Sequence, residues 1–185
     1  MFSILLLDDE PHVLSALRRT LRTPLGDQVS METHTDPHEA LARVGEHAFD
    51  LLITDFRMPA MNGVQFLRFA RELQPHALRM VVSASTEING VMSAINDVGV
   101  FRYVVKPWTT DVLVDDVRAA LAESFAGREQ RRLADAMRVE TGEIGRTEAE
   151  RRRLEELEPG LTDVQWGPNG EVLMPGHLPT QPGRF

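Results

Sequence analysis

The sequence contains no cysteine and a single lysine, and only 6% of its residues are aromatic. Without cysteine the chain can form neither a disulfide nor a thiolate metal site, and such a chain fits the reducing cytoplasm. Because aromatic residues are few, aliphatic side chains must supply most of the core. No apolar run approaches the roughly 18 residues that a membrane-spanning helix needs, and the N-terminus shows no export signal. We therefore expect a cytoplasmic protein that does not enter the membrane.

Length and charge narrow the classes of protein further. The 185 residues are enough for one ordinary domain and an extension, and a hydrophobic fraction of 42% is enough for a core. A net charge of -8 argues against a surface for non-specific nucleic-acid binding, which would need a basic stripe. Direct binding of nucleic acid is therefore not expected.

Strand-like and helix-like segments alternate through the first part of the chain. The predicted strands cover residues 3–7, 28–33, 50–54, 78–82 and 102–105. The predicted helices begin near Pro11, Pro37, Gly63, Thr86 and Val112. Five such repeats predict an α/β fold, with a doubly wound parallel sheet and helices on both faces. The most polar strand, at 28–33, is expected at an edge of the sheet.

Chemically active side chains follow the ends of these strands. Asp8 and Asp9 follow the first strand, Asp55 the third, Ser83 the fourth, and Lys106 the fifth. In open parallel sheets, ligands bind beyond the carboxyl ends of the strands, so we expect these side chains to share one site. Lysine commonly pairs with phosphoryl oxygens as a point charge, and this is the only lysine of the chain. The pattern predicts a site for phosphoryl chemistry.

Four short motifs stand in order at these strand ends: Leu7-Asp-Asp-Glu10, Asp55-Phe-Arg-Met-Pro59 with Gly63, Ser83-Ala84, and Tyr103-Val-Val-Lys-Pro107. Together they resemble the receiver domains of bacterial two-component response regulators, over about residues 1–121. The resemblance implies a flavodoxin-like five-stranded sheet in the order 2-1-3-4-5. It also implies a signalling module of a phosphorelay rather than an enzyme.

The resemblance assigns roles to the site residues. Asp55 would be the phosphoacceptor, and a sensor histidine kinase would be the donor. Mg²⁺ would be held by Asp8, Asp9, Asp55 and the backbone carbonyl of Arg57. Because crowded carboxylates repel one another, we expect raised carboxylate pKa values when no cation is bound. The residues implied to bind the phosphate or to switch are Ser83, Ala84, Tyr103 and Lys106, and those implied to be structural are Gly63 and Pro107, the latter after a cis peptide bond.

Simpler interpretations of some of these residues stay open. The acidic residues at 8–10 could serve only as the N-cap of the helix that begins at Pro11. Ser83 could be an ordinary hydroxyl at the end of a strand. Tyr103 could be a half-buried packing residue instead of a switch.

The composition changes after residue 121. Residues 122–158 are rich in arginine and glutamate, with a partly heptad-like row of apolar residues. We expect an extended helix there, which would bury its apolar row against a second copy of the chain as a coiled-coil dimer. Residues 159–185 are rich in proline and glycine, and segments near 164–166 and 171–174 predict a short β-hairpin that docks on another surface.

These features favour a phosphorylation-controlled switch whose output is protein–protein contact, with dimerisation through the extended helix. One alternative is a haloacid-dehalogenase-like phosphatase, although that family places its nucleophile on the first strand. Another is an adaptor that docks partners through its C-terminal tail. A DNA-binding regulator is not favoured, because the charged segment mixes both signs.

Overall fold

Five parallel strands form the centre of the computed structural model, which describes residues 1–84, 98–159, 165–166 and 172–173. The strands are β1 (Phe2–Leu7), β2 (Val29–His34), β3 (Leu51–Asp55), β4 (Leu78–Ala84) and β5 (Arg102–Lys106). They are hydrogen-bonded in the order β2-β1-β3-β4-β5, so the predicted flavodoxin-like topology is confirmed. The strand predicted for an edge, β2, is indeed at one edge.

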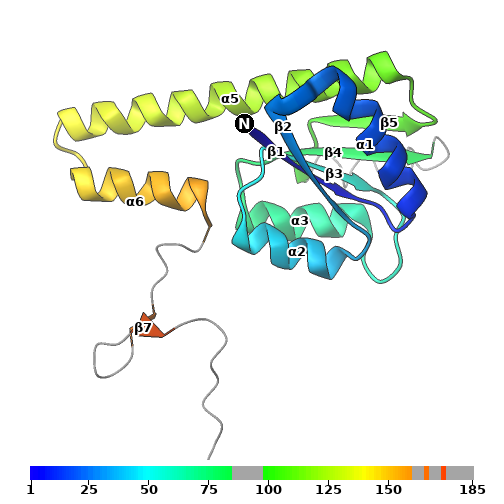
Figure 1. Cartoon of the computed structure of the whole chain (residues 1–185). Helices are drawn as coiled ribbons and strands as arrows, with labels where there is room; N and C mark the ends of the chain where they lie inside the picture. Colours follow the sequence, from blue (N-terminus) through cyan, green and yellow to red (C-terminus); the bar gives the residue numbers. More distant parts are fainter. Residues whose placement is uncertain (85–97, 160–164, 167–171, 174–185) are drawn as a thin grey trace, which may run out of the picture.

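Helices cover both faces of this sheet (Figure 1). On one face α1 (Pro11–Leu25), followed by the short η1 (Gly26–Gln28), and the first part of α5 (Thr110–Glu140) enclose an aliphatic cluster. On the other face α2 (Pro37–Glu46) and α3 (Gly63–Leu73) enclose a second cluster. The central strands are buried from both sides: the last four residues of β1 and all of β3 are buried, and most of these residues are apolar, as expected for a parallel sheet. The helix predicted from Thr86 lies outside the described residues.

Local signals in the sequence explain where two of these helices begin. The Asp36 carboxylate accepts hydrogen bonds from the backbone N–H groups of His38 and Glu39 at the start of α2. Asn62 and Gln65 form a reciprocal capping box at the start of α3. Asp36 comes shortly after the end of β2, and Asn62 follows the loop of residues 56–61 after β3, so the two caps fix where the helices start.

The extended C-terminal helix is confirmed only in part. Helix α5 continues past the sheet as far as Glu140, but it does not run on to residue 158. The chain turns between residues 141 and 145, and α6 (Arg146–Leu157) returns beside α5 as the second arm of a helical hairpin (Figure 1). Gly142, with a φ of 77°, supplies the left-handed conformation that ends α5. The predicted helical extension over 122–158 is therefore present, but as two helices instead of one.

Ion pairs hold the two arms of this hairpin together. Arg131 of α5 donates to Glu156 of α6 at 2.7 Å, and Arg152 of α6 approaches Asp135 of α5 at 3.5 Å.

In the tail, β6 (Gln165–Trp166) and β7 (Val172–Leu173) pair antiparallel, which confirms the predicted β-hairpin. Within the described ranges, no helix combines the length and the apolarity needed to cross a bilayer.

Candidate functional site

Lys106 joins two buried carboxylates at the carboxyl edge of the sheet. Its Nζ donates to Asp8 Oδ2 at 2.8 Å and to Asp55 Oδ1 at 2.5 Å. Asp8 follows β1 and Asp55 ends β3, while Lys106 ends β5 and reaches past β4 to both. Only 1% of Asp8 and 7% of Asp55 is exposed. The residues that the sequence places at separate strand ends therefore do meet at one site.

Backbone N–H groups hold the other oxygens of the two carboxylates. The amide of Arg57 donates to Asp55 Oδ2 at 2.6 Å, and the amide of Glu10 donates to Asp8 Oδ1 at 3.0 Å. The N-cap residue of α1 is Glu10, and its side chain makes no capping hydrogen bond. The acidic residues at 8–10 are therefore more than a helix cap, because Asp8 pairs with the lysine.

Burial and charge act in opposite directions on the pKa values of this cluster. Burial raises the pKa of Asp55 above its usual value, the Lys106 ammonium opposes this, and the Asp8 carboxylate adds a smaller rise. For Lys106, burial acts to lower the pKa, but the hydrogen bonds and charges of Asp55 and Asp8 outweigh it and raise the pKa. The predicted rise is thus confirmed for Asp55, although burial rather than repulsion between carboxylates is its main cause.

The cluster has the charge and the donor atoms that suit a small divalent cation. Two buried carboxylates face one ammonium, so one negative charge is left uncompensated. Mg²⁺ is commonly held by one or two carboxylates together with water and phosphate oxygens. No group of three or more acidic or histidine side chains is arranged as a metal site in the described part of the chain. The donor atoms of Asp8 and Asp55 therefore fit Mg²⁺, and the half-buried Asp9 follows Asp8 directly in the chain. The predicted part of Asp9 as a metal ligand stays a prediction.

Gly63 permits the tight packing of α3 against the end of β3. A Cβ atom built on Gly63 would lie 2.0 Å from the backbone oxygen of Asp55, where no side chain can fit. The amide of Gly63 also donates to the carbonyl of Phe56 at 2.9 Å. The start of α3 is thereby pressed against the residue that carries the central carboxylate.

The remaining predicted residues lie on β4 and β5. Ser83 is buried and pairs in register with Val105 of the neighbouring strand. Tyr103 is partly buried against the second cluster, and its hydroxyl donates to the carbonyl of Ala84 at 3.3 Å. The peptide bond before Pro107 is cis, as predicted. The roles of Ser83, Ala84 and Tyr103 in binding phosphate or in switching stay predictions.

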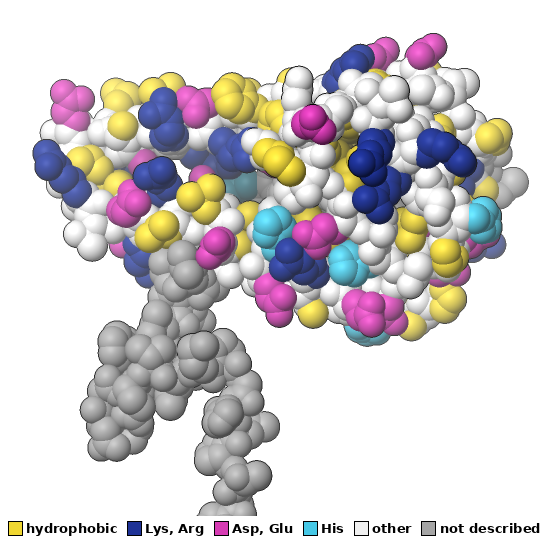
Figure 2. Space-filling model, in the orientation of Figure 1, with side chains coloured by type: hydrophobic (Ala, Val, Ile, Leu, Met, Phe, Trp, Pro, Cys, Tyr) yellow, Lys and Arg dark blue, Asp and Glu magenta, His cyan; other side chains and the backbone are white. Residues whose placement is uncertain are grey.

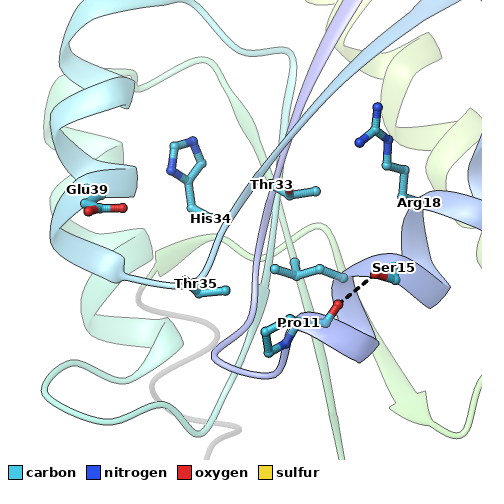
Figure 3. Close-up of a pocket in the computed structure, with 8 residues that line it drawn as sticks. Pro11, Ser15, Arg18, Thr33, His34, Thr35 and Glu39 are labelled. Atoms are coloured by element: carbon cyan, nitrogen blue, oxygen red, sulfur yellow. Dashed lines mark hydrogen bonds between the residues drawn. The ribbon is translucent and has the colours of Figure 1, made fainter.

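Beside this site lies a polar hollow that the sequence does not indicate. Figure 3 shows it between the first turns of α1, the end of β2 and the start of α2. It measures about 300 Å³, and its lining includes Ser15, Arg18, His34 and Glu39. The hollow begins at Pro11, three residues after Asp8, and so adjoins the carboxylate site along the same edge of the sheet.

Among known protein families, the model of the response regulator receiver domain matches residues 4–118 of this chain. This chain belongs to that family. The match covers the five parallel strands, except the first two residues of β1, and the first part of α5, so it includes each residue of the candidate site. The resemblance drawn from the motifs is thereby confirmed.

Relatives with curated descriptions are response regulators of transcription. Over 139 residues the chain is 32% identical to the hydrogenase transcriptional regulatory protein HoxA of Cupriavidus necator, covering 75% of this chain and 28% of that protein. Over 168 residues it is 32% identical to the transcriptional regulatory protein KdpE of Mycobacterium tuberculosis, covering 90% and 70%. The chain therefore spans only about a quarter of the HoxA proteins that it matches.

Solved structures show the same fold. A response regulator receiver domain protein from Clostridium thermocellum superimposes with a TM-score of 0.61 at 25% identity, covering 68% of this chain and 98% of that one. The receiver domain of an HD domain-containing protein from Pseudomonas fluorescens Pf-5 gives a TM-score of 0.63 at 27% identity, covering 69% and 92%. Both alignments cover about the length of the receiver domain.

Proposed function

We propose that Asp55 accepts a phosphoryl group from a phosphohistidine of a sensor kinase. The observation that supports this most is the Lys106 ammonium held against the Asp55 carboxylate. In the transfer, an Asp55 oxygen forms a bond to phosphorus while the bond from phosphorus to the imidazole nitrogen breaks. The imidazole leaves with that electron pair, and it is neutral once free because its other ring nitrogen already carries a proton in the phosphohistidine.

The residues around Asp55 suit this step because phosphoryl transfer depends on positioning and charge neutralisation. The amide of Arg57 fixes Asp55 Oδ2, which leaves Oδ1, now bonded to Lys106, as the attacking atom. As the phosphoryl group arrives, the ammonium passes from Oδ1 to a phosphoryl oxygen. The hydroxyl of Ser83 then donates to a second phosphoryl oxygen.

Asp8, Asp9, Asp55 and the backbone carbonyl of Arg57 would hold Mg²⁺, which when bound supplies positive charge against the phosphoryl oxygens. Without it, Asp8 and Lys106 neutralise each other and Asp55 keeps the excess negative charge, which repels a phosphoryl donor. Phosphorylation should therefore depend on the divalent ion.

The donor protein must approach along the carboxyl edge of the sheet, where Asp55 lies. The hollow shown in Figure 3 adjoins that edge and is lined by polar side chains of α1, β2 and α2. It supplies open surface beside the carboxylates, which suits a protein donor that covers this edge while its imidazole reaches Asp55.

The proposed output is contact between copies of the chain through the α5–α6 hairpin. We treat residues 1–121 as the receiver domain, 122–158 as the dimerisation segment and 159–185 as a tail. Within α6, Arg151 and Arg152 pair with Glu148, and Arg153 pairs with Glu150. Because these arginines are matched by glutamates of the same helix, α6 offers no basic stripe for DNA. This supports an output by protein contact.

Intact-mass measurement after incubation with acetyl phosphate and Mg²⁺ tests the phosphoacceptor. We expect the chain to gain the mass of one phosphoryl group, and the Asp55→Asn variant to gain none. Asp50→Asn is the matched control, because Asp50 is equally buried, 7% exposed, just before the start of the same strand. This control should be phosphorylated like the original chain. Modification that persists in Asp55→Asn would refute the assignment.

The phosphatase alternative is less well supported. Its nucleophile would follow the first strand, whereas the carboxylate bonded to both Lys106 and the Arg57 amide ends β3. Multiple turnover of a small phosphoester would revive it, while a single stoichiometric modification supports the receiver.

A further inference from the structure

The part of α5 beyond the sheet carries large apolar side chains that face solvent. Phe125, Leu133 and Met137 are 54%, 56% and 67% exposed. With 3.6 residues per turn, their spacings of eight and four residues place them within an arc of about 120° of the helix surface. Helix α6 contacts a different side of α5, through Arg131 and Asp135. The hairpin therefore leaves this apolar row uncovered, and in Figure 2 hydrophobic side chains are visible along α5 between charged ones.

A hollow opens beside the first residue of this row. It measures about 360 Å³ and lies between the end of α1, the start of the sheet and α5. Its walls include Phe2, Leu25, Leu121 and Phe125, with Arg118 among the residues that line it. The apolar row thus begins at an open, largely apolar recess.

We propose that a second copy of this chain covers this face, with the two α5 helices packed antiparallel. The arrangement rests on the homodimer of the proposed function and specifies its geometry. The two-fold axis passes midway between Phe125 and Met137. At the level of Phe125 of one copy, the facing helix therefore presents Met137 of the second copy, and the reverse. Met137 of one copy then fills the recess beside Phe125 of the other, and the contact is the same on both copies.

Charge favours the antiparallel pairing over the parallel one. Glu129 lies within the row, between Phe125 and Leu133, and is bonded to Arg132 of its own helix at 3.0 Å. In a parallel pair, each residue meets its own copy, so two Glu129 carboxylates would face each other and repel. In the antiparallel pair, Glu129 lies within one helical turn of Arg132 of the second copy. The exposed Glu140 likewise lies about one turn from Arg118 of the second copy.

The absence of cysteine makes a direct test simple. Ala122 and Glu140 are exposed on the same side of α5 and flank the apolar row without belonging to it. The antiparallel pair sets Ala122 of one copy opposite Glu140 of the other, so mixing Ala122→Cys with Glu140→Cys should yield a cross-linked heterodimer with a short bis-maleimide. Each variant alone should not cross-link, because identical positions would be about 27 Å apart along the helices.

Self-cross-linking of each single variant would overturn the antiparallel arrangement while leaving the homodimer intact. A chain that stays monomeric in light scattering, with and without beryllofluoride, would overturn the homodimer and this geometry together, without affecting the role of Asp55.

Met137→Gln should raise the dissociation constant of the dimer at least tenfold. Arg138→Gln, at the next exposed position, should leave the dissociation constant unchanged, and equal effects of the two changes would also count against the proposal.

Discussion

The site depends most on Lys106, whose ammonium pairs with both buried carboxylates. Asp8 and Asp55 would be costly to bury together as free anions, and the lysine compensates one of the two charges. The flexible stem of lysine lets its ammonium move from a carboxylate oxygen to a phosphoryl oxygen, which the fixed planar fork of arginine would do less well. The other basic residues of the chain are arginine, so the one lysine stands where a movable point charge is useful.

Ionisation of Asp55 should destabilise the fold. Replacing Asp55 should therefore change how the unfolding temperature depends on pH. Burial raises the pKa of Asp55 in the folded state, so its ionisation is less favourable there than in the unfolded chain. At a pH below the ordinary carboxyl pKa of 3.8, Asp55 is protonated in both the folded and the unfolded chain, and its contribution to stability is fully present. As pH rises towards the folded pKa, that contribution is lost. Asp55→Asn should therefore match the original chain at acid pH and unfold at a higher temperature at neutral pH.

Asp36 supplies a control of opposite sign for these thermal unfolding measurements. Backbone N–H groups of Glu39 and His38 lower the pKa of Asp36. Its stabilising contribution is present above the ordinary pKa and is lost as pH falls, so Asp36→Asn should cost stability at neutral pH. If Asp55→Asn instead lowered the unfolding temperature at neutral pH, the two carboxylates would be a net stabilising pair with Lys106 rather than a strained one.

At the scale of single elements, most of the sheet could be predicted because its signals are local. Apolar runs define β1, β3 and β4, and the polar residues of β2 correctly indicate an edge. Asp8, Asp55 and Lys106 could be brought together because a parallel sheet places its carboxyl ends on one side. The direct contact between Asp8 and the lysine could not be predicted, since it depends on side-chain packing across three strands.

Gly63 shows how one position couples α3 to the end of β3. Gly63→Ala places a Cβ against the Asp55 carbonyl, a backbone atom that cannot rotate away, so we expect a loss of about 1–3 kcal/mol in the free energy of unfolding. Phosphorylation of Asp55 should slow as well. Gly45→Ala in α2 is the matched control, because its Cβ meets no atom within 4 Å and should stabilise by up to about 1 kcal/mol. Urea titration measures the free energy of unfolding of both variants. Equal stability of Gly63→Ala and Gly45→Ala would contradict the close contact between Gly63 and the Asp55 carbonyl.

At the scale of the whole molecule, the break after α5 escaped prediction because the signals there conflict. Glutamate and arginine favour helix throughout 122–158, while Gly142 and Gly145 only weaken it. The choice between one long helix and a hairpin is made by contacts between distant residues, such as Arg131 with Glu156. The attachment of the extension to the sheet is of the same kind, and the sequence offers no signal for it.

That attachment centres on Asp50, buried at the edge of the sheet opposite to the phosphoacceptor. Its carboxylate accepts hydrogen bonds from the Ser3 amide at 2.8 Å and the Ser124 hydroxyl at 3.0 Å, and it pairs with Arg128 at 2.7 Å. The guanidinium of Arg128 also lies 5.5 Å from the ring centre of Phe2. The part of α5 that leaves the receiver domain is thereby tied to β1 and to the start of β3.

Arg128→Gln should therefore destabilise the entire molecule, not only the extension. The change leaves the Asp50 carboxylate, 7% exposed, without its cation, which should cost about 1–3 kcal/mol in the free energy of unfolding. Arg132→Gln, which breaks an exposed pair with Glu129 one turn further along, should cost much less, because solvent screens an exposed ion pair. Denaturant unfolding compares the two, and hydrogen exchange locates the effect. If Arg128→Gln loosened α5 beyond Ser124 while the unfolding midpoint stayed unchanged, the extension would fold independently of the receiver domain.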